Sequence, residues 1–330
     1  RHAVVEDPGY LPVRNILRDR GFAVTPVAVD ENGIRIEKLP INIRTAAYIN
    51  PGNQFPTGAV TPIGNRHRLL SWALANDSFI IEDDYDSELR YTGRPIPPLK
   101  SLDTANRVIY LGSFSSTLFA SVKISYMVLP EPLSEIFHEI KNDYTQTCSK
   151  AEQLTLAAFM QRGLYQINIK KLRTLYAQKL QHLLASVHRY GAGFITPLNT
   201  ASGINITLRV SSGKTPETLA AEAASLGIRV LPVDFPAAQS GIGDGWSSAE
   251  SGVEDGIWDG AESGARDDAA NAHHRGNAPS TLPSSKKQSA AEPMLDSTFI
   301  LYYHQIPIEK IEPLMQILFQ TWQCEARESN

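Results

Sequence analysis

The sequence predicts an α/β fold built around a mainly parallel β-sheet. Short apolar or β-branched segments without polar alternation stand between helical patterns, as is typical of strands covered on both faces. These segments are residues 46–50, 79–82, 107–112 and 124–129. A helical pattern at residues 66–77 separates the first two of them. Because a strand, a helix and another strand follow one another, neighbouring strands are expected to run parallel.

The chain opens on HAVVEDPGY, a strand pattern that runs into a Pro-Gly turn. We therefore expect Arg1 to lie inside a fold. Residues 131–190 are helical in pattern, and their length suits a helix that connects two domains. The strand patterns that follow, with one intervening helix at residues 216–227, predict a smaller α+β domain. These strand patterns are residues 204–210, 228–233 and 299–304.

From these patterns we expect a large domain over residues 1–150, and a linking helix with a small C-terminal domain over residues 151–330. One segment inside the second part, at about residues 236–297, is dominated by Gly, Ala, Ser and Asp. Such a composition buries too little apolar surface to offset the entropy lost on ordering. We expect a low-complexity, disordered insertion at a surface turn.

Composition excludes several classes of protein. The 330 residues carry 31 Lys and Arg against 35 Asp and Glu, and the net charge of −4 gives no field that would attract nucleic acid to the whole chain. Cys148 and Cys324 are the only cysteines, which favours a reducing cytoplasm over a disulfide framework or a metal site. No apolar segment approaches the roughly 20 residues of a membrane span, and no signal peptide is recognisable.

Four polar segments follow predicted strands and carry the chemistry. They are EDPGY at residues 6–10, NPGNQFPTG at 50–58, IIEDDYDSELRY at 80–91 and YLGSFSSTLFASVKISY at 110–126. Their order places a carboxylate, a phenol and a group of hydroxyls at one edge of a parallel sheet, where open α/β sheets bind ligands. Hydroxyls and backbone N–H groups that leave a strand are a common cradle for phosphate.

Together these segments resemble the aminotransferase-like domain of MocR/GabR-type transcription regulators, which belong with the fold-type I aminotransferases dependent on pyridoxal 5′-phosphate (PLP). In that family they appear as EDPGY, SHQFPTG, EDDYDSEFRY and LGTFSKTLFPGLRLGY. The resemblance runs from Glu6 to about Val233 and resumes at Phe299. It implies a three-layer large domain with a mainly parallel sheet, a smaller C-terminal α+β domain, and a missing N-terminal part.

The resemblance also implies roles for individual residues in binding PLP. Tyr10 takes the place of the aromatic residue that stacks on the ring, and Asp83 that of the aspartate that pairs with the ring nitrogen. Tyr85 matches the phenol that hydrogen-bonds the ring oxygen. Ser113 and Ser115 match hydroxyls that hold the phosphate.

Three positions depart from the family in ways that bear on activity. Ser116 stands where the family has the lysine that forms the Schiff base, and a hydroxyl forms no imine and is too weak a base to move the substrate proton. Lys123 replaces a phosphate-binding arginine, and it supplies charge without the bidentate fork. Ile300 also stands where the family often has an arginine that grips the substrate carboxylate.

Three functions remain open from the sequence. The first is an effector domain of a regulator, which senses a small amino acid or amine and holds PLP non-covalently without turnover. The second is a working aminotransferase in which another lysine substitutes. The third is a truncated remnant that binds nothing. By resemblance we also expect a cytoplasmic homodimer, with DNA bound only through a winged-helix module that this chain lacks.

Overall fold

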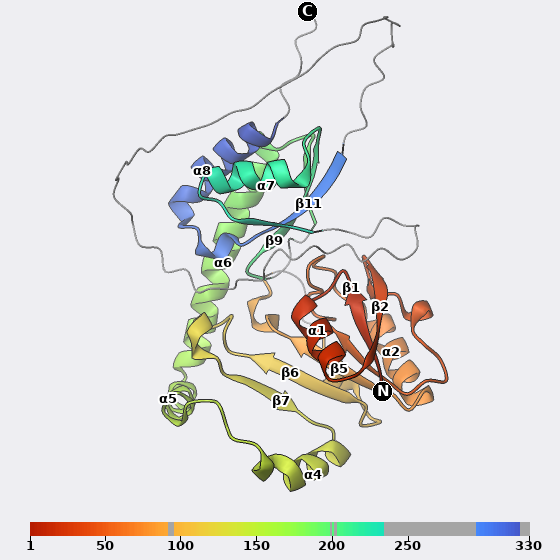
Figure 1. Cartoon of the computed structure of the whole chain (residues 1–330). Coiled ribbons are helices and arrows are strands. Elements are labelled where there is room, and N and C mark those ends of the chain that lie inside the picture. Colours follow the sequence, from red (N-terminus) through yellow and green to blue (C-terminus); the bar gives the residue numbers. More distant parts are fainter. Residues whose placement is uncertain (92–95, 199, 201–202, 234–294, 324–330) are drawn as a thin grey trace, which may run out of the picture. The chain divides into compact units, whose positions relative to one another are not determined.

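The computed structural model of the chain describes residues 1–91, 96–198, 200, 203–233 and 295–323. The N-terminal part forms a seven-stranded sheet with the order β3-β2-β1-β4-β5-β6-β7 (Figure 1). Its strands are β1 (His2–Asp7), β2 (Ala23–Asp30), β3 (Gly33–Ile34), β4 (Thr45–Ile49), β5 (Phe79–Asp84), β6 (Val108–Ser113) and β7 (Ser125–Val128). The five central strands are parallel, whereas β3 and β7 at the two edges are antiparallel to their neighbours. The mainly parallel sheet confirms the predicted fold class.

Helices α1 (Leu11–Asp19), α2 (Ile63–Ala75) and α3 (Leu99–Leu102) connect the strands of this sheet. Helix α2 begins after Pro62 and buries Leu69, Trp72 and Ala73, which recur at helical spacing, against strands β4 and β5. Short 3-10 turns add η1 (Ile36–Lys38), η2 (Ser87–Leu89) and η3 (Ala120–Val122). The predicted helix at residues 66–77 therefore exists and starts three residues earlier.

The helical region after β7 is divided into α4 (Glu131–Ile140), η4 (Lys141–Asp143), α5 (Lys150–Gln161) and α6 (Leu164–Tyr190). The hydroxyl of Ser149 caps α5 by accepting a hydrogen bond from the N–H of Glu152. All four residues of edge strand β7 are exposed, and α4, which lies beyond that edge in Figure 1, has no buried residue. The buried residues of α6 lie mainly in its C-terminal half, which packs on the second sheet.

The second sheet is antiparallel and has the order β10-β11-β9-β8. Its elements are β8 (Ile195–Pro197), β9 (Ile206–Ser212), β10 (Val230–Pro232), β11 (Leu295–Leu301), α7 (Pro216–Ser225), η5 (Tyr303–Gln305) and α8 (Ile308–Trp322). Its core includes Phe299, Phe319 and Trp322, none of which is exposed to solvent. None of the helices in the described part of the chain is long and apolar enough to cross a membrane.

The predicted insertion at residues 236–297 is wrong at its end, because β11 already begins at Leu295 and pairs with β9. The first part of β11 was not predicted because it contains polar residues. In the structure Ser297 is buried, and Asp296 accepts a hydrogen bond from Ser211. The remainder of the insertion, residues 236–294, lies outside the described residues. The boundary near residue 150 stays a prediction.

A glycine is required in the turn that leaves β1. A Cβ atom on Gly9 would lie 2.3 Å from the main-chain oxygen of Glu6, whereas a Cβ atom on Gly64 in α2 would meet nothing within 4 Å. We expect Gly9→Ala to lower the free energy of unfolding by about 1–3 kcal/mol, because backbone atoms must move. Gly64→Ala should leave it unchanged or raise it by up to about 1 kcal/mol. Urea unfolding of both variants tests this, and equal stabilities would contradict the described turn.

Candidate functional site

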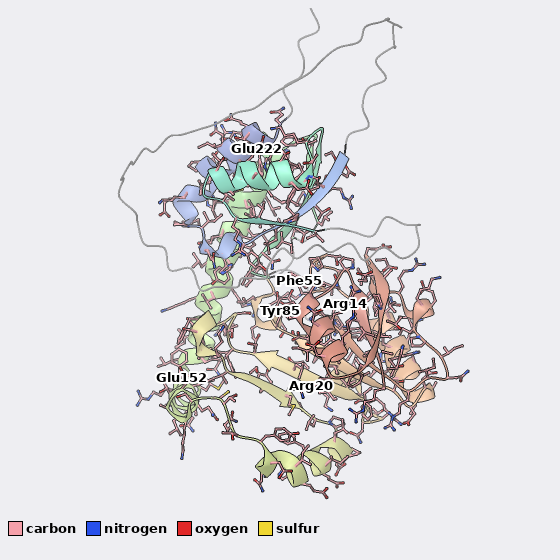
Figure 2. All side chains as sticks on the ribbon, in the orientation of Figure 1. Arg14, Arg20, Phe55, Tyr85, Glu152 and Glu222 are labelled. Carbon is pink, nitrogen blue, oxygen red and sulfur yellow. The ribbon has the colours of Figure 1, made fainter. Side chains whose placement is uncertain are left out.

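The residues predicted to bind a ligand lie after the carboxyl ends of three parallel strands. Tyr10 follows β1, Asp83 and Tyr85 lie at and beyond the end of β5, and Ser113 is the last residue of β6. Strand β5 pairs with β6 so that Asp83 lies opposite Leu111. The carboxyl edge of a parallel sheet is the usual place for a ligand in such folds. Figure 2 shows the side chains of Phe55 and Tyr85 at this edge.

Asp83 is largely buried and accepts hydrogen bonds from Tyr48 of β4 and from Asn50, which directly follows β4. The hydroxyl of Tyr48 donates a hydrogen bond to Oδ2 of Asp83, and the side-chain amide of Asn50 donates to its main-chain oxygen at 3.0 Å. Burial raises the pKa of Asp83, and these hydrogen bonds oppose the rise. A cation that approached Asp83 would therefore be bound favourably, because it would offset the cost of burying the negative charge.

A second buried carboxyl, Glu6, lies behind Asp83. Its Oε2 atom accepts hydrogen bonds from the main-chain N–H of Asn50 at 3.1 Å and from the side-chain amide of Gln54 at 3.3 Å. Burial raises the pKa of Glu6 to about 8, and the charge of Asp83 adds to the rise. Glu6 is only 5% exposed. At neutral pH it is therefore mostly protonated.

The segment NPGNQFPTG is held in place by Gln54. The amide of Gln54 donates to the main-chain oxygens of Pro8 and Phe55 at 2.9 and 2.6 Å, and its Oε1 accepts from the N–H of Thr57 at 3.1 Å. The ring of Phe55 meets that of Tyr10 edge to face, with centroids 6.2 Å apart. Tyr10 is 47% exposed, so one side of its ring remains open to a ligand.

Tyr85 is held by the same segment. Its hydroxyl donates a hydrogen bond to the main-chain oxygen of Asn53 at 3.0 Å, and the amide of Asn53 donates to Oδ2 of Asp86 at 2.6 Å. Burial raises the pKa of Tyr85 well above its usual range, so it stays neutral. In this arrangement the oxygen of Tyr85 has lone pairs left for a ligand, while its proton is already engaged.

The hydroxyl-rich residues form one loop between β6 and β7. The N–H of Phe114 donates to the main-chain oxygen of Ile124 at 3.1 Å, which closes the loop, and the hydroxyl of Ser113 accepts from the N–H of Ser115 at 3.2 Å. Ser116 lies half-buried in this loop. Lys123 lies at its far end, exposed, with a left-handed backbone at a φ of 45°. Ser113, Ser115 and Ser116 thus lie within four residues of one another in this loop, and Lys123 lies at its exposed end.

A cavity of about 300 Å³ lies beside β5 but is not lined by Asp83. Its walls include Arg66, Glu82, Asp84 and Tyr110. Successive strand residues point to opposite faces of a sheet, so Glu82 and Asp84 face away from Asp83. Glu82 accepts hydrogen bonds from the first N–H groups of α3, and Asp84 accepts one from Tyr110. We assign these side chains to the structure of the sheet, and the candidate site to the opposite face.

Sequence reasoning missed the residues that support the site. Glu6, Tyr48, Asn50 and Gln54 all contact Asp83 or the segment beside it. Three of them stand inside the segments EDPGY and NPGNQFPTG. A polar residue inside an otherwise apolar strand, such as Glu6 after Ala3, Val4 and Val5, was the available signal.

A scan against protein-family models found no match. The chain is 42% identical over 230 residues to the HTH-type transcriptional regulator YdeL of Bacillus subtilis, a match that covers 70% of this chain and 50% of YdeL. It is 31% identical over 229 residues to the probable rhizopine catabolism regulatory protein MocR of Rhizobium meliloti, covering 69% of this chain and 46% of MocR. The chain thus spans about half the length of the curated relatives it matches.

Solved structures with the same fold are aminotransferases. Pyrococcus horikoshii kynurenine aminotransferase superposes with a TM-score of 0.68 at 19% identity, covering 97% of this chain and 68% of the enzyme. The α-aminoadipate aminotransferase LysN of Thermus thermophilus superposes with the same TM-score at 19% identity, covering 97% of this chain and 70% of LysN. The chain therefore belongs with the aminotransferase-like domains of MocR/GabR-type transcription regulators and has the fold of the type I PLP-dependent aminotransferases.

Proposed function

We propose that this chain is the ligand-sensing domain of a transcription regulator, and that it binds PLP non-covalently without catalysing transamination. The observation that carries the proposal is the serine at position 116, in a loop that otherwise keeps the hydroxyls expected to hold a phosphate. The relatives YdeL and MocR are named as regulators, which favours sensing over metabolism. The ligand sensed would be a small amino acid or amine.

The ring end of the site fits PLP. Asp83 is a largely buried carboxylate that accepts a hydrogen bond from Tyr48, and a protonated ring nitrogen would pair with its charge. The side-chain oxygen of Asn50 is buried and has no hydrogen-bond partner among the described residues. An orphaned acceptor beside a buried carboxylate favours a ligand that carries a hydrogen-bond donor.

The phosphate end fits less completely. Ser113 and Ser115 offer two hydroxyls from one closed loop, which suits a phosphate oxygen. Lys123 is exposed, so its ammonium would have to fold back toward the loop. Tyr85 would reach the ring oxygen as a donor only by releasing the main-chain oxygen of Asn53. We therefore expect affinity for PLP below that of a complete site.

The residues of the site bind and orient but do not replace the missing lysine. When bound, PLP supplies an aldehyde and an electron-withdrawing ring. The hydroxyl of Ser116 can donate or accept a hydrogen bond at neutral pH, yet it cannot carry a proton between substrate carbons. We do not expect Lys123 or Lys100 to take over the role of the missing lysine. Lys123 is exposed, and the ammonium of Lys100 donates a hydrogen bond to the main-chain oxygen of Val108 at the start of β6.

The remaining expectations belong to the same proposal. DNA would be bound by a part of the regulator outside the matched half of the relatives, and the chain would act as a cytoplasmic homodimer. Residues 1–150 would form the PLP-binding domain, and residues 151–330 the linking helix and small domain.

Equilibrium dialysis against PLP, followed by borohydride reduction and mass spectrometry of the intact protein, tests the proposal. We expect saturable binding that Asp83→Ala weakens at least tenfold, because the buried charge partner of the ring nitrogen is lost. Borohydride reduction should leave the mass of the intact protein unchanged, because no lysine is joined to PLP. Stoichiometric addition to one lysine would instead support a working aminotransferase, and no binding at all would support a remnant.

Restoring the lysine gives a second test. We expect Ser116→Lys to be labelled stoichiometrically by PLP and borohydride at position 116, because the neighbouring Ser113 and Ser115 would hold the phosphate within reach. Ser121→Lys is the matched control, since it adds a lysine to an exposed position of the same loop. Peptide mapping distinguishes the two sites. Equal labelling of both variants would mean that the loop no longer directs the cofactor.

A further inference from the structure

Glu6 connects the two sides of the candidate site, although it touches no group predicted to meet PLP. It stands at the end of β1, which pairs in parallel with β4. Its side chain is 5% exposed and makes two hydrogen bonds, one toward the Asp83 side and one toward the Tyr10 side. A buried carboxyl is costly, so its presence here calls for a role.

The first connection runs through Asn50 to Asp83. Oε2 of Glu6 accepts from the main-chain N–H of Asn50 at 3.1 Å, which fixes the backbone of Asn50. The side-chain amide of Asn50 then donates to the main-chain oxygen of Asp83 at 3.0 Å. Through these two hydrogen bonds Glu6 helps to fix the position of the Asp83 backbone at the end of β5.

The second connection runs through Gln54 to Tyr10. Oε2 of Glu6 also lies 3.3 Å from the amide nitrogen of Gln54, which shares its two N–H groups among Glu6 and the main-chain oxygens of Pro8 at 2.9 Å and Phe55 at 2.6 Å. The ring of Phe55 meets the ring of Tyr10. Glu6 therefore holds both the carboxylate for the ring nitrogen and the aromatic pair beside the ring.

We infer that Glu6 is a positioning residue for the PLP site, which sets Asp83 through Asn50 and the Tyr10–Phe55 pair through Gln54. The inference rests on the proposed function. Glu6 performs this role as a neutral acid. The ionisable groups that face it are Asp83 of β5, Tyr48 of β4 and Tyr85, and burial raises the pKa of both tyrosines, which keeps them neutral.

The test compares two ligands that differ in one atom. PLP carries the ring nitrogen, whereas 1-deazapyridoxal 5′-phosphate has carbon at that position, so only PLP gains from a well-placed Asp83. We expect Glu6→Ala to weaken PLP binding about tenfold, because Asp83 would no longer be well placed for its hydrogen bond with the ring nitrogen. Binding of the deaza compound, which lacks that nitrogen, should weaken less than about threefold. Glu6→Gln should bind PLP within about twofold of the unaltered protein at pH 7, because an uncharged amide oxygen accepts the same two N–H groups.

Glu82→Ala is the matched control, since Glu82 is an equally buried glutamate of the opposite sheet face. We expect it to affect both ligands alike. Where Glu6→Ala does not fold, Glu6→Asp tests the same link, because its carboxyl is drawn back by one methylene group from Asn50. Equal loss of both ligands in the Glu6 variants, or failure of Glu6→Gln to retain PLP, overturns the inference. Absence of PLP binding to the unaltered protein overturns the proposed function itself, a distinguishable result.

The neutral state of Glu6 has its own readout in stability. The folded chain keeps the Glu6 proton up to a pH of about 8, whereas the unfolded chain loses it near 4.5. The contribution of Glu6 to stability is therefore full below pH 4.5 and is lost as the pH rises through 8. We expect Glu6→Gln to show a flatter decline in unfolding free energy over this range. Identical pH profiles would contradict a neutral Glu6.

Discussion

The burial of two carboxyls at the ends of β1 and β5 is the constraint on which the site depends. Burial raises the pKa of both carboxyls, the charge of Asp83 raises that of Glu6 further, and hydrogen bonds from Asn50, Gln54 and Tyr48 oppose these rises. Glu6, with a pKa of about 8, is mostly protonated at neutral pH and accepts the hydrogen bonds that hold the segment beside Asp83.

In the loop after β6 the closed turn is present, but the lysine that reacts with PLP in the family is replaced by Ser116. Ser113 and Ser115 keep the closed turn expected of a phosphate cradle, yet Ser116 carries a hydroxyl where an amine would be needed. In the proposed function, a site that keeps Asp83 for the ring and the hydroxyls of Ser113 and Ser115 for the phosphate, but has no lysine at position 116, would bind PLP reversibly. Such a site reports the presence of a ligand without consuming it, which agrees with the regulators among its relatives.

The sequence predicted the parallel sheet and the place of Asp83 because β4, β5 and β6 are continuous apolar segments that end in polar residues. It did not predict β2, whose Thr25 and Pro26 interrupt the apolar pattern, or α8, which contains Pro313. The start of β11 was missed because Asp296 and Ser297 are polar although they pair with β9. The support for Asp83 was also missed, since contacts between residues more than thirty positions apart leave no local pattern.

We propose that PLP is held at the end of β5 by Asp83 and by no covalent bond. A crystal structure of the unaltered protein grown with PLP tests it most directly. The account predicts electron density for the whole cofactor, with the ring nitrogen within hydrogen-bond distance of Asp83 and the aldehyde carbon unattached beside Ser116. Continuous density from that carbon to any lysine nitrogen, or a cofactor bound away from Asp83, would contradict it.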